Sequence, residues 1–427
     1  MDRAAVHTPS VTSAAATPLT PPTEPTGRER IRIILILGTL VALVPLTIDL
    51  YLPALPAIAR DLNVSSSAVQ FTLTGTLLGL GLGQLVIGPL SDTLGRRIPL
   101  IGGTALHIAA SLLCLLAPSV ALLATFRVLQ GVGAAASMVV ALAVLRDLFT
   151  ERTAATTLSR LMLVMGVVPI LAPTLGGAIL VVASWRGVFA VLAALGVVLL
   201  IVALTALRET LPLERRRPGE IVPVLRTYGS LLADREFVAL VLVGALGMSA
   251  LFSYVSGAPF VLQGQYGLSQ QMFAVVFGLG AVALIGASQL NPMLLDRFTS
   301  KQVVLGGLVA STVFGVAMTA LAVTGLGGLP GFMVALWLAL GSIGFVLPNA
   351  PALALSRHGE AAGTASALLG AAQFGLGALI APLVGVLGND ARAMATIMMS
   401  GSMLALLILG TVVWRDRRQR AWVPTGA

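Results

Sequence analysis

Charged residues are scarce in this chain of 427 residues. Asp, Glu, Lys and Arg make up 10% of it, whereas soluble domains carry about 25%. Cysteine is limited to Cys114, so no disulfide can form within the chain. Hydrophobic residues, in contrast, make up 57%, and the mean hydropathy is +0.98. This composition excludes a soluble domain and indicates an integral membrane protein.

Three motifs of enzymes and ATPases are also missing. The sequence contains no His-Glu-x-x-His metal motif, no Gly-x-Ser-x-Gly nucleophile elbow and no Gly-x-x-x-x-Gly-Lys-Ser/Thr phosphate loop. We therefore expect neither an enzyme nor an ATP-driven pump, and no bound cofactor or metal.

Twelve long apolar stretches predict twelve membrane-spanning helices, since a spanning helix needs about 20 apolar residues. The stretches lie near 32–56, 68–90, 99–117, 120–145, 157–183, 187–207, 237–262, 271–295, 302–324, 330–355, 362–387 and 393–414. The predicted fold class is therefore an all-α integral membrane protein.

Basic residues gather on one side of these spans. With a cytoplasmic N-terminus, all but four of the 26 Lys and Arg residues fall in cytoplasmic segments; Arg60, Arg186 and Arg392 lie outside, and Arg127 lies in the membrane. This is the positive-inside pattern, so the net charge of +9 reflects membrane orientation and not nucleic-acid binding. We predict a multi-pass protein of the cell membrane with both termini in the cytoplasm.

The longest polar segment between spans divides them into six and six. We predict two six-helix bundles, 29–207 and 236–414, joined by a cytoplasmic linker at 208–235. Residues 1–28, rich in Thr, Pro and Ala, are typical of a disordered cytoplasmic tail, and 415–427 form a second tail. Repeated halves with a site between them are common in secondary transporters.

The second cytoplasmic turn, from Gly88 to Arg97, reads GPLSDTLGRR. It resembles the signature between the second and third helices of the major facilitator superfamily, although Thr93 stands where a basic residue is common. In that family the turn's aspartate helps to latch the cytoplasmic side closed. The resemblance assigns this latch to Asp92 and implies two pseudo-symmetric bundles. We expect a tight turn at Gly95 and a charge cluster in which Arg146 and Asp147, at the end of the fourth span, join Asp92. The predicted cytoplasmic gate is Gly88, Asp92, Gly95, Arg96, Arg97, Arg146 and Asp147.

The fourth and fifth spans carry two further family elements. The segment FRVLQGVG, with Arg127 and Gln130 on one helix side, resembles an Arg-x-x-Gln-Gly element linked to proton coupling. The segment PILAPTLGG resembles the element that marks exporters exchanging drug for protons, with Ala172 in place of the usual glycine; its key residues are Pro169, Pro173, Gly176 and Gly177. We expect the two prolines to bend the helix and the glycine pair to permit close packing. A kinked packing helix is the alternative for this segment.

Three other segments are similar to the bicyclomycin and chloramphenicol resistance branch of the twelve-span drug:proton antiporters. They lie at 45–56 (PLTIDLYLPALP), 184–186 (SWR) and 252–260 (FSYVSGAPF). The resemblance covers about residues 30–415 and implies transport by alternating access.

Asp49 and Arg127 are the charges that lie deep within the spans. Each lies about seven residues, roughly 10 Å, below the outer surface. Because charges within membranes tend to pair, we predict that they approach each other at a central cavity and form the proton-coupling pair. A permanent ion pair that only fixes the first and fourth helices is the alternative.

Other polar residues within the spans are candidates to line the substrate cavity with Asp49. They are Gln130, Tyr254, Asn349 and Gln373, of which the last three could instead form hydrogen bonds between helices. His107 has no acidic residue nearby in the sequence, so we expect a packed, hydrogen-bonded histidine.

The leading functional hypothesis is a monomeric multidrug transporter that exports small amphipathic compounds in exchange for protons. A dedicated exporter or importer of one metabolite is an alternative, although sugar sites usually carry many polar side chains. A membrane receptor is a second alternative, but it would not need a membrane-embedded acid at the level of an arginine. The expected partners are drugs, protons and the lipid bilayer, and not nucleic acid.

Overall fold

The computed structural model describes residues 24–216, 221–358 and 361–421. Within these ranges every regular element is helical, and twelve helices are long and apolar enough to cross a membrane. The prediction of twelve spans is therefore confirmed. Of the two predicted tails, residues 1–23 and 422–427 lie outside the described residues.

The first six spans form one bundle. Its elements are α1 (Gly27–Asp49), η1 (Leu52–Ala54), α2 (Leu55–Asp61), α3 (Ser66–Leu94), α4 (Arg97–Leu115), α5 (Val120–Leu148), α6 (Glu151–Val182) and α7 (Arg186–Thr205). The first span changes to a 3₁₀ turn at Pro53 because proline cannot donate the helical hydrogen bond. Ser65 and Ser119 cap α3 and α5, accepting hydrogen bonds from the N–H groups of Ala68 and Leu122.

The last six spans form the second bundle. Its elements are α9 (Arg235–Pro259), η3 (Phe260–Gln265), α10 (Gln270–Gln289), α11 (Asn291–Leu295), α12 (Ser300–Thr324), α13 (Gly328–Leu355), α14 (Ala362–Ile380), α15 (Leu383–Val386) and α16 (Ala391–Ala421). The linker between the bundles contains η2 (Leu213–Arg215) and α8 (Ile221–Ala233), so part of this polar segment is helical.

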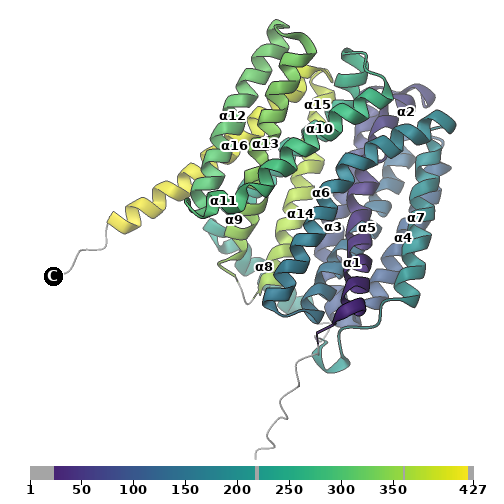
Figure 1. Cartoon of the computed structure of the whole chain (residues 1–427), viewed down its shortest axis with the longest axis vertical. Helices are drawn as coiled ribbons and strands as arrows, with labels where there is room; N and C mark the ends of the chain where they lie inside the picture. The colour runs from purple at the N-terminus through teal and green to yellow at the C-terminus, as the bar shows by residue number, and fades with distance from the viewer. Residues whose placement is uncertain (1–23, 217–220, 359–360, 422–427) are drawn as a thin grey trace, which may run out of the picture.

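The two bundles lie side by side and repeat the same packing (Figure 1). In the first, α3 and α4 pack on α5, α4 packs on α7, and α1 packs on α6. The second has a counterpart of each pair: α10 and α12 on α13, α12 on α16, and α9 on α14. Between the bundles, α3 contacts α14 and α6 contacts α10, which are also equivalent pairs. This repeat confirms the predicted pseudo-symmetric architecture.

The helix ends define two sides of the molecule. We call the basic side the end where α1 begins and where α3, α5 and α7 end, because the Arg-rich turns and α8 lie there. The opposite side is the end where α2, α4 and α6 end and where α9 passes into η3.

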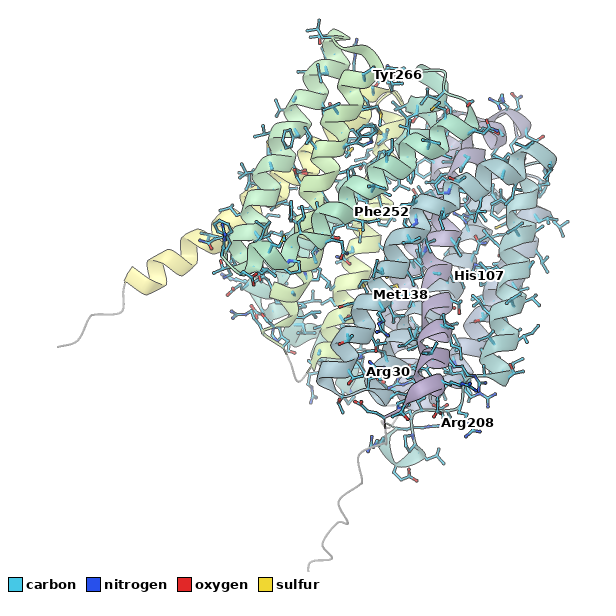
Figure 2. The ribbon with its side chains drawn as sticks, viewed as in Figure 1. Arg30, His107, Met138, Arg208, Phe252 and Tyr266 are labelled. Atoms are coloured by element: carbon cyan, nitrogen blue, oxygen red, sulfur yellow. The ribbon has the colours of Figure 1, made fainter. Side chains whose placement is uncertain are left out.

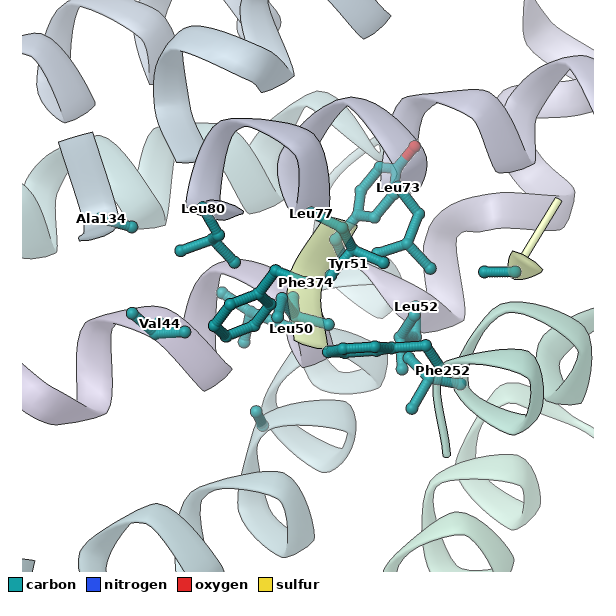
Figure 3. Packing of buried hydrophobic residues seen from close by; sticks show 14 of the residues in the cluster. Val44, Leu50, Tyr51, Leu52, Leu73, Leu77, Leu80, Ala134, Phe252 and Phe374 are labelled. Carbon is teal, nitrogen blue, oxygen red and sulfur yellow. The ribbon is translucent and has the colours of Figure 1, made fainter. Parts of the chain in front are cut away.

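Apolar packing continues from one bundle into the other. Phe252 of α9 lies against Phe374 of α14, with ring centroids 5.8 Å apart. These rings belong to the same buried cluster as Tyr51, Leu73 and Leu77 of the first bundle (Figure 3). The bundles are therefore in direct contact over part of their length.

Small residues allow the helices within a bundle to approach closely. At the crossing of α4 and α5, a Cβ atom added to Gly133 would lie 2.6 Å from the backbone oxygen of Gly103 and 2.6 Å from the backbone nitrogen of His107. Backbone atoms cannot move aside cheaply, so glycine is required at this crossing.

We predict that Gly133→Ala lowers the stability of the first bundle by about 1–3 kcal/mol, the usual range for overpacking. Thermal unfolding in detergent measures this. Gly102→Ala on α4 is the matched control, because no atom lies within 4 Å of its added Cβ. Equal melting temperatures for the two variants would contradict the close crossing.

Candidate functional site

Arg127 is the largest fully buried side chain of the described residues and organises the centre of the first bundle. Its Nη1 donates to Gln130 Oε1 at 2.6 Å and to the backbone oxygen of Thr47 at 3.0 Å. Its guanidinium carbon lies 4.4 Å from the ring centroid of Tyr51 and 5.8 Å from that of Phe189. Aromatic faces stabilise a cation, so they replace part of the hydration that Arg127 has lost.

A buried hydrogen-bond network extends from this arginine to α4. Gln130 Nε2 donates to Ser111 Oγ at 2.8 Å, and Ser111 Oγ donates to the backbone oxygen of His107. Thr47 Oγ1 donates to the backbone oxygen of Leu43, so it accepts from His107 Nε2 at 3.0 Å. His107 is packed and hydrogen-bonded as expected, inside the first bundle (Figure 2).

The predicted pairing of Asp49 with Arg127 is wrong in this conformation. Both residues are described, and no ion pair of up to 4.0 Å joins them. The shared depth holds, because Arg127 contacts Thr47 and Tyr51 on either side of Asp49. The direction differs: Thr47 and Tyr51 are four residues apart and share one helix face, whereas Asp49 points about half a turn away.

Asp49 faces the second bundle instead. It is 5% exposed, and within the described ranges its carboxylate has neither an ion pair nor a hydrogen bond. The side chains of Asp49 and of Tyr254 on α9 lie within electrostatic range of each other. Asp49 is thus a buried acid at the contact between the bundles.

The other predicted cavity residues have different surroundings. Gln130 is fully buried and uses its amide within the first bundle, so it does not line a cavity in this conformation, contrary to the prediction. Tyr254 stacks on Phe277 with centroids 4.9 Å apart. Asn349 donates to Asn291 Oδ1 at 2.6 Å, an interhelical hydrogen bond. Gln373 is partly exposed on α14, which leaves its predicted cavity role open.

A cavity of about 750 Å³ opens on the basic side between the bundles. Its walls come from the ends of α3 and α5 in the first bundle, α8 of the linker and the start of α14 in the second bundle. Apolar side chains outnumber polar ones; the polar and charged ones are Gln84, Ser91, Asp92, Thr93, Arg96, Arg146, Tyr228, Thr364 and Ser366. The bundles therefore separate on the basic side.

The predicted gate residues form an ion-pair cluster within the first bundle. Arg96 Nη1 donates to Asp92 Oδ1 at 2.6 Å, and Arg96 Nε donates to Asp147 Oδ2 at 2.9 Å. Thr210 Oγ1 also donates to Asp147 Oδ2. The cluster joins the ends of α3 and α5, and in this conformation Asp92 contacts its own bundle, not the second.

The remaining gate residues differ in their roles. Gly95 has a φ of +89°, which favours glycine, as the predicted tight turn requires. Arg97 Nη2 donates to the backbone oxygen of Leu204. Among the described residues Arg146 donates only to Leu142 of its own helix, so its predicted place in the charge cluster is wrong. A Cβ on Gly88 would meet no atom within 4 Å, so packing does not require glycine there.

Glu209 is a member of this cluster that the sequence analysis missed. Its Oε1 accepts from the backbone N–H of Arg96 at 2.8 Å, and its Oε2 accepts from that of Arg97 at 3.2 Å. These N–H groups begin α4 and lack partners within the helix, so Glu209, which follows the last span of the bundle, caps α4. The acidic residue directly after the sixth span was the available signal.

The fifth span carries the predicted exporter element at the contact of three helices. Pro169 and Pro173 lie inside α6. A Cβ on Gly176 would collide with the backbone oxygen of Leu50, and one on Gly177 would lie 3.6 Å from the backbone oxygen of Gln270. Gly176 thus allows α6 to approach the first span, and Gly177 faces α10 of the second bundle. The prediction of close packing at the glycine pair holds at Gly176.

The second bundle has its own ion-pair cluster on the basic side. Arg357 Nη1 pairs with Glu236 Oε2 at 2.9 Å, and Lys301 Nζ pairs with Glu236 Oε1 at 3.3 Å. His358 Nε2 lies 3.0 Å from Asp234 Oδ2. On the basic side, each of these two ion-pair clusters therefore joins helices of its own bundle.

We predict that Glu209→Gln weakens the first bundle. Burial would raise the pKa of Glu209, but hydrogen bonds from the N–H groups of Arg96, Leu211 and Arg97 outweigh it and hold the pKa below its ordinary value of 4.5. The stabilisation is therefore complete above pH 4.5 and is lost as the pH falls through the lower folded pKa. Thermal unfolding at pH 7 and below pH 4.5 measures it, with exposed Glu214→Gln as the control. A melting temperature unchanged by Glu209→Gln at pH 7 would refute the cap.

We also predict that Arg127→Met does not lower thermal stability. Two guanidinium nitrogens, Nε and Nη2, are buried without a hydrogen-bond partner, and no described carboxylate pairs with Arg127, so removing the cation breaks no ion pair among the described residues. The several kcal/mol needed to bury an ion are then recovered. Arg127→Lys, which keeps the charge but loses the planar stacking on Tyr51, should melt lower. A melting temperature of Arg127→Met at or below that of Arg127→Lys would contradict this reading.

Comparison with known proteins agrees with this architecture. The model of the Major Facilitator Superfamily matches residues 35–382. The chain is 40% identical over 380 residues to the uncharacterized MFS-type transporter YdgK of Bacillus subtilis, covering 88% of this chain and 93% of the relative. It is 33% identical over 371 residues to the multidrug resistance protein MdtL of Escherichia coli, covering 87% and 93%.

A third relative and a solved structure extend the comparison. The bicyclomycin resistance protein homolog of Haemophilus influenzae is 31% identical over 366 residues, covering 84% of this chain and 90% of the relative. A D-xylose-proton symporter has the same fold, with a TM-score of 0.72 at 16% identity over 89% of this chain and 97% of that one. The chain therefore belongs to the major facilitator superfamily, as a membrane transporter similar to the bicyclomycin resistance branch of the drug:proton antiporters.

Proposed function

We propose that this transporter exports small amphipathic compounds in exchange for protons. One observation carries the proposal: Asp49 is a buried carboxyl at the contact of the two bundles, with neither an ion pair nor a hydrogen bond among the described residues. An ionised carboxylate in such surroundings is costly unless a proton or a cation neutralises it.

The conformation supports alternating access. The bundles are in contact on the opposite side, where η1 packs on α9 and α2 packs on η3, whereas a cavity separates them on the basic side. We place the basic side in the cytoplasm of a cell membrane because of its arginines. The conformation is then inward-facing, and rocking of the bundles would expose Asp49 to the other side.

The proton and the substrate compete for Asp49 in this scheme. A compound that enters from the basic side displaces the proton, either by pairing a cation with the carboxylate or by altering its surroundings. After the bundles rock, a proton from outside neutralises Asp49 and favours release of the compound. Arg127 keeps its contacts within the first bundle throughout.

The cavity walls indicate the class of substrate. More of the lining side chains are apolar than polar, and the charged side chains of Asp92 and Arg96 already pair with each other. Asp49 supplies one negative charge, so we expect neutral compounds or monocations with an apolar body. The printed names of the relatives, multidrug resistance protein and bicyclomycin resistance protein homolog, support the same class. A single chain contains both bundles, so we propose that a monomer suffices.

We predict that Asp49→Asn abolishes proton-driven transport. The amide keeps the shape of the side chain but can neither release a proton nor pair with a cation. Uptake of ethidium, chloramphenicol and bicyclomycin into everted vesicles, with and without an uncoupler, measures this. For a transported compound, we expect the initial rate to fall at least about 100-fold, the lower end of the range for removing a proton-transfer group.

Asp61→Asn is the matched control. Asp61 lies three turns further along the same span, at the end of α2, where it accepts from Trp185 Nε1 and pairs with Arg186 of its own bundle. Uncoupler-sensitive uptake should persist in this variant. Uncoupler-sensitive uptake by Asp49→Asn at the parent rate would refute the proposed role of Asp49.

A further inference from the structure

Gln70 connects the two bundles on the opposite side. It lies in the second turn of α3 and is fully buried. Its amide nitrogen donates to the backbone oxygen of Ser256 on α9 at 3.2 Å and to Asn389 Oδ1 at 2.7 Å. Both acceptors belong to the second bundle, so the Gln70 amide donates two hydrogen bonds from the first bundle to the second.

The acceptor segment is fixed by its own backbone. Asn389 has a φ of +56°, a conformation that asparagine tolerates better than most residues. Its N–H donates to the backbone oxygen of Val384 at 2.8 Å, and the N–H of Ala391 donates to Gln265 Oε1 at 2.7 Å. The amide oxygen of Asn389 is therefore presented to Gln70 by a segment held at both ends.

The helices around Gln70 fit closely. A Cβ on Gly385 of α15 would collide with Gln70 Oε1 and lie 2.9 Å from Ser67 Cα. The second bundle thus approaches α3 to backbone contact where the hydrogen bonds form. Hydrogen bonds in such dry surroundings are stronger than in water, and their loss is correspondingly costly.

These contacts can exist only while the opposite side is closed. Opening that side would move α9 and the segment at Asn389 away from α3 and would break both hydrogen bonds. On the basic side, the same α3 helix lines the open cavity through Gln84 and Asp92. The start of α3 therefore forms hydrogen bonds to the second bundle on the closed, opposite side, and the end of α3 lines the cavity on the open, basic side.

We propose that Gln70 is the latch of the opposite side. By latch we mean that its two hydrogen bonds to the second bundle stabilise the conformation that is closed on this side, and that they must break before the transporter opens outward. The proposal rests on alternating access, but it concerns the conformational equilibrium and not the substrate or the proton. Gln70 is thus a positioning residue, distinct from Asp49 and from the cluster around Arg96.

The test measures distances between the bundles without substrate or proton gradient. Spin labels are placed on the opposite side by Ser184→Cys with Thr324→Cys, and on the basic side by Thr205→Cys with Ser356→Cys. All four residues are exposed, and each pair joins the two bundles. The parent chain serves as the labelling blank because its single Cys114 is buried.

Gln70→Met removes both hydrogen bonds while keeping the length of the side chain. We expect the ratio of open to closed chains on the opposite side to rise about tenfold, as the loss of two buried hydrogen bonds implies. The label distances on the basic side should shorten in the same fraction of chains. Gln70→Glu keeps the shape of the side chain and, when ionised, has acceptor oxygens only, so it should shift the ratio in the same direction at alkaline pH.

Two further variants sharpen the test. Asn389→Gly keeps the positive φ but removes one acceptor, so it should give a smaller shift than Gln70→Met. Thr74→Val is the matched control one turn along α3, because Thr74 Oγ1 donates to the backbone oxygen of Gln70 in its own helix and not to the second bundle. It should leave both distance distributions unchanged.

Unchanged distributions in both Gln70 variants would overturn the latch. Longer distances on the opposite side without shortening on the basic side would also overturn it, because they would indicate local loosening and not a change of access. Failure of the proposed drug:proton exchange would leave these distances unaffected, so the two proposals fail independently.

Discussion

The burial of one arginine, which has no carboxylate partner among the described residues, is the constraint on which the first bundle depends. Arg127 must be held by neutral groups, and the available ones are the Tyr51 and Phe189 rings, the Gln130 amide and the backbone oxygen of Thr47. Because these groups come from α1, α5 and α7, satisfying the cation fixes three helices against one another. His107 and Ser111 extend the arrangement to α4.

This arrangement determines what Asp49 can do. Thr47 and Tyr51 occupy the helix face toward Arg127, so Asp49 projects from the other face toward the second bundle. The positive charge is thereby confined to the rigid interior of one bundle, and the acid lies where the bundles move. Arg127 therefore has a fixed place within the first bundle, whereas Asp49 is available to a proton or a cation at the bundle contact.

Much of the fold could be predicted from the sequence, because apolar length and basic turns are local signals. The twelve spans followed from composition, and Gly95 and Gly176 followed from motifs whose geometry requires glycine. The Asp49–Arg127 pairing failed because depth was considered without helix face; the spacing of Thr47 and Tyr51 already contained the missing information. Glu209 and Gln70 form hydrogen bonds with residues that are far away in the sequence, so no local sequence pattern predicts their partners.

The central claim is that a single buried carboxyl at the bundle contact exchanges its proton for the substrate. Its most direct measurement is the pH change when ethidium is added to purified transporter in weakly buffered detergent solution. We expect proton release on binding by the parent chain and binding without release by the Asp49→Asn variant. Equal proton release by both chains would contradict it.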